Sequence, residues 1–267
     1  MNRSIALIVA MAGVASSGAS AAVSISTGDV LVNDRTMNLV ANGSFEVGNI
    51  GINTGWTPGT HIGGYPATEV AAIPSWNSSY PAGAYGWWGP LGFTGAPAPD
   101  GRNQVYFGNA FNTTGTTASV AANGVITFAA APSFSGRPAP VTLSQTISGL
   151  DTSSVHRLEF WTSGEGNNGG FTGTGIFGLN ITGEGLTYLL LPASSNTFGT
   201  SERFYVDFTP SASSVTITFL NWGHITDLGG GAASELALDD VILNVIPIPG
   251  AVGVLAMGGL HAARRRR

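Results

Sequence analysis

The sequence predicts an all-β protein that folds as a single jelly-roll β-sandwich, and three observations support this. Glycine accounts for 39 of the 267 residues, and no stretch of the body shows a sustained helical period of apolar residues. Short runs rich in β-branched and aromatic residues recur between clusters of Gly, Ser, Thr, Asn and Pro, a pattern typical of strands joined by turns. Hydrophobic residues make up 43% of the chain, which provides enough apolar mass for a core and excludes a wholly disordered protein.

Composition also excludes several classes of function. Charged residues make up 9% of the chain, where roughly a quarter is usual. Cysteine is absent, which excludes disulfides, thiolate zinc sites and cysteine nucleophiles. Between residues 22 and 263, five arginines face fifteen acidic residues and there is no lysine. A body with this balance repels phosphate backbones, so we expect no nucleic acid partner.

The first element is a leader that covers residues 1–21. It has a basic start at Arg3, a short apolar run over Ile5–Ala15, and a small-residue site at Ala19-Ser20-Ala21. This arrangement predicts a secretory signal helix that is cleaved after Ala21, and therefore export. A buried helix is the alternative, although the Gly, Ser and Ala residues at its end favour a peptidase site. Residues 22–37 then form a connecting segment.

The body covers residues 38–246 and shows no internal repeat or linker, so we expect one domain. The segment from Ser214 alternates polar and apolar residues, as expected for a strand with one face in water. Many short strands of this kind indicate a sandwich or jelly roll. The expected strands are Val125–Phe128, Val141–Ile147, Val155–Thr162, Ile176–Ile181, Leu186–Leu191, Arg203–Thr209, Val215–Asn221 and Leu236–Ile246.

The last element is a tail that covers residues 247–267. Pro247, Pro249 and Gly250 precede an apolar run over 251–263, and the chain then ends on Arg264, Arg265, Arg266 and Arg267. The apolar run predicts a short hydrophobic helix. Its length is less than the roughly 20 residues that a helix needs to span a bilayer fully. Terminal arginines favour retention on the cytoplasmic side of a membrane.

This tail resembles the PEP-CTERM sorting tail of exported bacterial proteins, in which a proline motif precedes a short membrane segment and an arginine cluster. The resemblance implies a precursor anchored in the inner membrane, processing by an exosortase, and association with the cell surface and exopolysaccharide. Ile248 stands where that family has an acidic residue, so the chain departs from the motif at this position. A tail that only anchors the protein is the alternative.

Several motifs of the body occur in an order that resembles the galactose-binding-like jelly rolls, including DUF642 proteins and carbohydrate-binding modules of families 4 and 9. They are Asn42-Gly43-Ser44-Phe45-Glu46, Ile73-Pro74-Ser75-Trp76, Asp100-Gly101-Arg102-Asn103, Leu143–Leu150, Val155–Trp161 and Leu236–Leu243. The resemblance implies the jelly-roll fold and, less specifically, a carbohydrate ligand.

The same resemblance implies a structural Ca²⁺ ion held by Glu46 and Asp239, which belong to the opening and closing motifs. Calcium prefers six to eight oxygen ligands, and carboxylates together with loop carbonyls provide them. Asp240 is expected to point to the opposite face of its strand, since side chains alternate with a period of two. The alternative is that both residues are ordinary acidic residues at strand ends.

Aromatic residues gather in one Gly- and Pro-rich segment, where Tyr85, Trp87 and Trp88 lie close together. Flat aromatic rings can pack on the C–H faces of sugars, so these three side chains are expected to form a carbohydrate-binding platform. Packing of the same rings at the edge of the core is the alternative.

Catalytic motifs are sparse. The four histidines are scattered, and no G-x-S-x-G elbow is present. Glu159 and Glu165 flank the end of an expected strand and could form a glycosidase pair. We therefore expect a non-catalytic exported surface or matrix protein that binds polysaccharide. A purely structural matrix component and a glycan-active enzyme are the alternatives.

Overall fold

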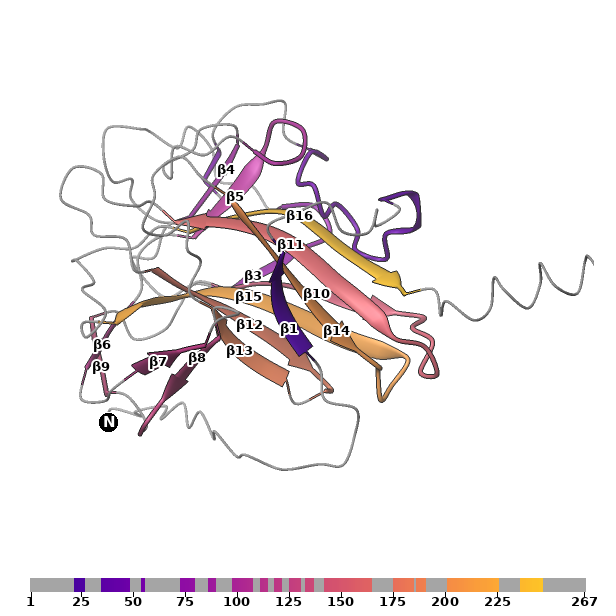
Figure 1. Cartoon of the computed structure of the whole chain (residues 1–267). Coiled ribbons are helices and arrows are strands. Elements are labelled where there is room, and N and C mark those ends of the chain that lie inside the picture. The colour runs from indigo at the N-terminus through magenta and orange to yellow at the C-terminus, as the bar shows by residue number, and fades with distance from the viewer. Residues whose placement is uncertain are drawn as a thin grey trace, which may run out of the picture.

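The structure, a computed structural model, is a β-sandwich of two layers (Figure 1). It describes residues 22–26, 35–48, 54–55, 73–79, 86–89, 98–107, 111–114, 118–121, 125–130, 133–136, 142–164, 175–184, 186–190, 201–225 and 236–246. Within these ranges the one helix is the short 3-10 helix η1 (Arg35–Met37), and the other regular elements are strands. The all-β sandwich expected from the sequence is thus confirmed.

Sheet A has seven strands in the order β1-β14-β11-β16-β5-β4-β2, and every described pairing in it is antiparallel. The last described strand, β16, lies inside the sheet between β11 and β5. The strands are β1 Ala22–Ser26, β2 Thr54–Gly55, β4 Gly86–Gly89, β5 Gln104–Phe107, β11 His156–Gly164, β14 Glu202–Phe208 and β16 Leu236–Val245.

Sheet B has the order β13-β12-β15-β10-β3. Strand β6 joins this sheet through a parallel pairing with β15, and β9 pairs with β6 in the antiparallel sense. Two further strands, β7 and β8, pair as a separate ribbon. The strands are β3 Asn77–Ser79, β6 Phe111–Thr114, β7 Ala118–Val120, β8 Ile126–Phe128, β9 Ser133–Gly136, β10 Thr142–Ser148, β12 Gly175–Thr182, β13 Leu186–Leu190 and β15 Ser214–Ile225.

All eight strands expected from the sequence are present as β8 and β10 to β16, each within a few residues of its predicted bounds. The short strands β2 to β7 and β9 lie in segments rich in Gly, Pro, Ser and Asn, where alternation is too brief to show. Strand β1 falls in the segment 22–37 that the sequence assigns to a connection, so this segment contributes an edge strand to sheet A.

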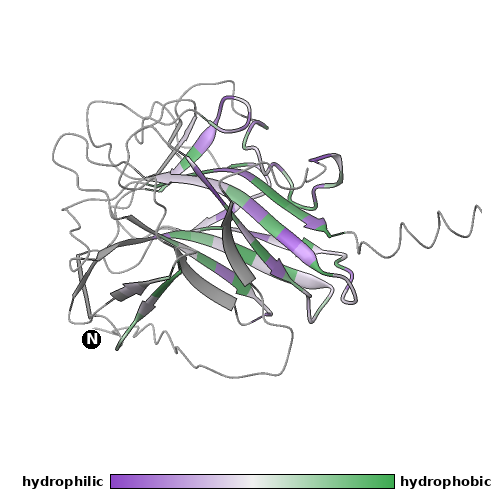
Figure 2. Ribbon diagram, viewed as in Figure 1, coloured by the Kyte–Doolittle hydropathy of each residue, from purple (hydrophilic) through white to green (hydrophobic). Residues whose placement is uncertain are grey.

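The core lies between the two sheets and is rich in phenylalanine. Phe160 of β11 is central to it: its ring lies 5.9 Å from that of Phe204, 5.7 Å from that of Phe177 and 5.1 Å from that of Phe219. These rings come from both sheets, and each is fully buried. Aromatic pairs of this kind contribute about 0.5–1.5 kcal/mol beyond the burial of apolar area. Figure 2 shows the alternation behind this core as green and purple bands along the strands.

A segment that covers residues 35–48, here called the strap, joins the two sheets. The side chain of Asn38 donates to the carbonyl oxygen of Val241 and accepts from the backbone N–H of Leu243, both at 2.9 Å. From sheet B, the amide of Gln145 bonds both backbone groups of Ala41, at 2.8 and 2.9 Å. At Gly43 a β carbon would lie 2.0 Å from the Val241 carbonyl oxygen, so the close approach of strap and β16 requires glycine.

The leader at 1–21 and the tail at 247–267 lie outside the described residues, as do both helices expected there. In the described part of the chain, no helix combines the length and the apolar character that a membrane crossing needs.

Candidate functional site

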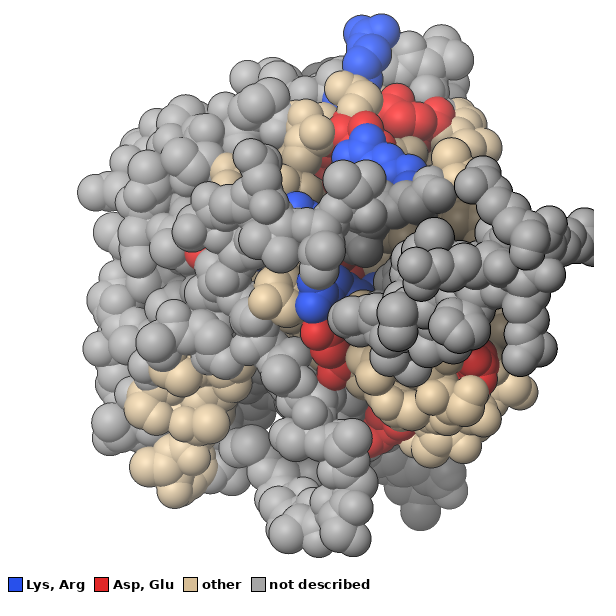
Figure 3. Space-filling model, turned by 45° about the vertical axis from the view of Figure 1, so that its right-hand side comes forward, with Lys and Arg blue, Asp and Glu red and all other residues tan. Residues whose placement is uncertain are grey.

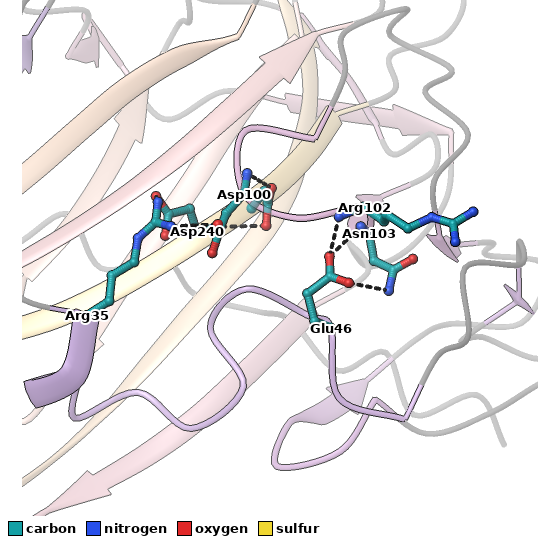
Figure 4. Close-up of polar contacts among 7 residues, drawn as sticks. Arg35, Glu46, Asp100, Arg102, Asn103 and Asp240 are labelled. Atoms are coloured by element: carbon teal, nitrogen blue, oxygen red, sulfur yellow. Dashed lines mark hydrogen bonds and ion pairs between the residues drawn. The ribbon is translucent and has the colours of Figure 1, made fainter.

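The loop from Asp100 to Asn103 is fastened at one end by the carboxylate of Glu46. Oε1 of Glu46 accepts hydrogen bonds from the backbone N–H groups of Arg102 and Asn103, each at 2.6 Å, and Oε2 accepts from the Asn103 amide at 3.1 Å (Figure 4). Gly101 has a φ of +68°, and a β carbon there would lie 2.5 Å from Oε1. The Asp-Gly-Arg-Asn sequence therefore forms a turn that fits closely around this carboxylate.

The same loop is fastened at its other end by β16. Oδ2 of Asp239 accepts from the backbone N–H of Asp100 at 2.9 Å, and its Oδ1 accepts from that of Asp240 at 2.7 Å. Arg35 of the strap donates to Asp100 at 2.5 Å and to Asp240 at 2.7 Å (Figure 4). Glu46 and Asp239 are thus brought to one short loop, but each bonds different residues of it.

Burial dominates the electrostatics of the two aspartates. It raises the pKa of Asp239 to about 8, against the opposing effect of the two backbone N–H groups that it accepts. Burial also raises the pKa of Asp240, while the guanidinium of Arg35 acts to lower it. Asp240 has a φ of 50°, at the point where β16 carries one extra residue opposite β11. This bulge sets the two neighbouring carboxylates in different surroundings.

The described residues only partly fit the expected calcium ion. No three His, Asp or Glu side chains among them converge as a metal site. The carboxylate oxygens of Glu46 and Asp239 are already engaged by N–H donors. Two features nevertheless favour a cation nearby: Oδ1 of Asn103 is a buried acceptor without a hydrogen-bond partner, and the Asp239 carboxylate is costly to ionise where it lies. Calcium binding therefore stays a prediction.

The structure corrects one member of the expected aromatic platform. Trp88 is 2% exposed and lies in the core, where its indole N–H donates to the carbonyl oxygen of Phe45 at 2.7 Å. A side chain buried in this way cannot stack on a sugar, so its assignment to a binding platform was wrong. Trp87 pairs with Tyr106 in the ladder between β4 and β5, but its side chain lies outside the described part, as does all of Tyr85.

The carboxylate pair considered for catalysis is described only in part, since Glu165 lies outside the described residues. Glu159 is 3% exposed and forms an ion pair with Arg203. A carboxylate that is buried and held by a guanidinium is not presented to a substrate, as either role in a glycosidase pair requires.

A group of polar and aromatic side chains, of which the sequence analysis singled out Glu159 alone, lies on the outer face of sheet A. Side chains alternate along β11 and β14, and the alternate residues Leu158, Phe160, Phe204 and Val206 are buried in the core. Their neighbours point away from the core and form what we call the charged face: Arg157, Glu159, Trp161, Arg203, Tyr205 and Asp207.

The charged face is ordered in cross-strand rows. Arg157 is opposite Asp207, and its guanidinium binds that carboxylate with two hydrogen bonds of 2.6 and 2.7 Å. The same guanidinium lies 4.2 Å from the centre of the Tyr205 ring. In the described part of the surface in Figure 3, most arginine atoms adjoin acidic ones and do not form a separate basic patch.

The outer face of sheet B differs. Most of its outward residues on β10 and β15 are serines and threonines, with Leu220 as an exception, and cross-strand neighbours bond one another: Thr146 to Thr216 at 2.8 Å and Ser148 to Ser214 at 3.3 Å. We call this the hydroxyl face; its described members are Ser144, Thr146, Ser148, Ser214, Thr216 and Thr218.

The charged face had a signal in the sequence. Arg157, Glu159 and Trp161 occupy alternate positions of one expected strand, and Arg203, Tyr205 and Asp207 occupy alternate positions of another. Two strands with charged and aromatic residues at every second position predict a polar face on each. Which strands are neighbours could not be read from the sequence.

Comparison with protein families finds no family model that matches the chain, and no curated protein matches it either. Among solved structures, TmCBM61 in complex with β-1,4-galactotriose is 13% identical, with a TM-score of 0.40 over 78% of this chain and 99% of that one. The enzymatically active domain of tailspike protein 4 of bacteriophage CBA120 is 14% identical, with a TM-score of 0.38 over 79% of this chain and 22% of that one. The likeness does not extend to a ligand or an activity of this chain.

Proposed function

We propose that the chain is a non-catalytic, exported cell-surface or extracellular-matrix protein that binds polysaccharide through its β-sandwich. The observation that carries this proposal is the charged face, which places aromatic rings beside paired guanidinium and carboxylate groups. Sugars present C–H faces to aromatic rings and hydroxyls to hydrogen-bonding groups. A surface that offers rings, donors and acceptors together therefore suits them.

Two finer parts of the proposal come from the sequence. The order of motifs from Asn42 to Leu243 supports a galactose-binding-like jelly roll. The leader at 1–21 and the tail at 247–267 support a precursor held in the inner membrane, processing by an exosortase, and final placement at the surface.

The absence of catalysis is proposed from the state of Glu159. Glu159 is 3% exposed and held by Arg203, so its carboxylate is engaged within the fold and is not presented to a substrate.

The test uses the full-length chain and a panel of purified neutral and acidic polysaccharides, with affinity electrophoresis for binding and a reducing-end assay for cleavage. The proposal expects retardation by at least one polysaccharide and no release of reducing ends. Migration unchanged by every member of the panel would favour the purely structural matrix role. New reducing ends would favour the glycan-active enzyme.

A further inference from the structure

We propose that the charged face is the glycan site, with Trp161 as its stacking platform, and that it takes neutral glycans in preference to acidic ones. This inference rests on the proposed polysaccharide binding and adds the location of the site and the class of ligand. It is carried by the register of sheet A and by the pairing of charges on that sheet.

Trp161 has the position that a stacking platform needs. It lies on β11, where Arg203 of β14 is opposite it on one side and Asp239 of β16 is opposite it on the other. Side chains directly opposite in a ladder lie about 5 Å apart, so polar groups border the indole on both sides. The indole is half-buried, and no described residue accepts a hydrogen bond from its N–H. Asp239 is 1% exposed and both of its carboxylate oxygens accept from backbone N–H groups, so a sugar ring placed on Trp161 would meet available polar groups on the Arg203 side.

Arg203 supplies a donor at this edge. It forms an ion pair with Glu159, yet its Nε is a buried nitrogen without a hydrogen-bond partner. Buried donors of this kind are uncommon, because leaving one unpaired is costly. Because this Nε is covered, a hydroxyl held over Trp161 would meet the exposed fraction of the Arg203 side chain, which is 18%.

The charge pairing determines the ligand class. Arg157 is bound by Asp207, and Arg203 is bound by Glu159, so each of these guanidinium groups already faces a carboxylate. An anionic sugar would have to compete with those carboxylates and would be repelled by them. A neutral sugar hydroxyl can accept from a guanidinium and donate to the adjacent carboxylate, and thus uses both members of a pair.

The first experiment compares Trp161→Ala with Thr218→Ala, a matched variant on the hydroxyl face, in the full-length chain. Affinity electrophoresis in a neutral galactan or glucan that binds the unmodified chain provides the readout, and thermal melting reports on the fold. We expect Trp161→Ala to weaken binding roughly thirtyfold, as for aromatic residues at binding hot spots. Thr218→Ala is expected to bind as the unmodified chain does. Unchanged binding by Trp161→Ala would overturn the location of the site.

The second experiment tests the ligand class with polygalacturonate and a neutral polysaccharide side by side. The unmodified chain is expected to prefer the neutral polymer. The variant is Asp207→Asn, because the Asp207 side chain is partly exposed and its change should disturb folding less than a change at buried Glu159. It removes the carboxylate that binds Arg157 and is expected to strengthen polygalacturonate binding about tenfold. Equal or tighter binding of polygalacturonate by the unmodified chain would overturn the neutral class while leaving polysaccharide binding intact. Failure of every polysaccharide to bind would overturn both proposals.

Discussion

The outer faces of the two sheets follow the same alternation but carry different chemistry. On sheet A, outward positions hold arginines, carboxylates and aromatic rings, and most of their polar contacts are ion pairs. On sheet B, most outward positions of β10 and β15 hold serines and threonines, and two pairs of them bond across strands. Hydroxyls left partly in water need no particular partner, whereas a half-buried charge does. Polar groups on one face of this molecule are therefore mutually dependent, and those on the other are nearly independent.

The largest expected effect follows from removing one member of the most buried pair. Arg203→Met leaves the Glu159 carboxylate, which is 3% exposed, without its cation. Because an uncompensated buried charge is costly, we expect the free energy of unfolding to fall by about 3 kcal/mol. Urea denaturation at pH 7 measures it.

The matched control is Arg157→Met. Its partner Asp207 has a side chain that is 26% exposed, so water replaces part of the lost interaction, and we expect a loss of about 1 kcal/mol. Equal losses for the two variants would show that burial does not distinguish the pairs. The double variant Arg203→Met, Glu159→Gln should recover part of the loss, since it removes both charges.

A second prediction concerns calcium. If Glu46 and Asp239 share an ion, a hundredfold excess of Ca²⁺ over its Kd should stabilise the folded chain by about 2.7 kcal/mol. Melting in EGTA and in millimolar calcium measures the difference. Asp239→Asn should abolish the response, and Asp240→Asn, its neighbour bound by Arg35, should retain most of it. Superimposed melting curves for the unmodified chain would contradict calcium binding by Glu46 and Asp239.

A third prediction uses pH in the presence of EGTA. The pKa of Asp239 is raised to about 8 in the folded chain, above the unfolded value of about 3.9. The contribution of this group to stability is therefore full below pH 4 and is lost as pH rises through about 8. We expect the free energy of unfolding to fall by about 2 kcal/mol between pH 6 and 8, and Asp239→Asn to flatten this slope. A slope that Asp239→Asn leaves unchanged would assign the pH dependence to other groups.

The smallest expected effect is on the hydroxyl face. Thr146→Val removes the 2.8 Å contact with Thr216 on an exposed surface. We expect a change of about 0.3 kcal/mol in the free energy of unfolding, because water can bond the remaining hydroxyl and valine suits a strand. A loss above about 1 kcal/mol in urea denaturation would show that hydroxyl neighbours depend on one another as charges do.

The sequence was informative where a strand is long enough for its alternation to be seen. Strands β10 to β16 were predicted close to their observed bounds, and the polar positions of β11 and β14 were visible in the same pattern. Trp88 was misassigned because β4 spans only Gly86–Gly89, too short to show which of two adjacent tryptophans points inward. The pairing of Glu159 with Arg203 depends on β11 and β14 being neighbours, which local sequence does not determine.

The position of β16 inside sheet A affects how the molecule would bear a mechanical load. This strand is hydrogen-bonded to β11 along one edge, and to β5 and the strap along the other. Tension applied to the chain beyond residue 246 would act along the strand axis, perpendicular to these bonds. The bonds would then be sheared together instead of peeled one after another. A chain held at that end and bound through its sheets would therefore oppose extraction with all of these bonds at once.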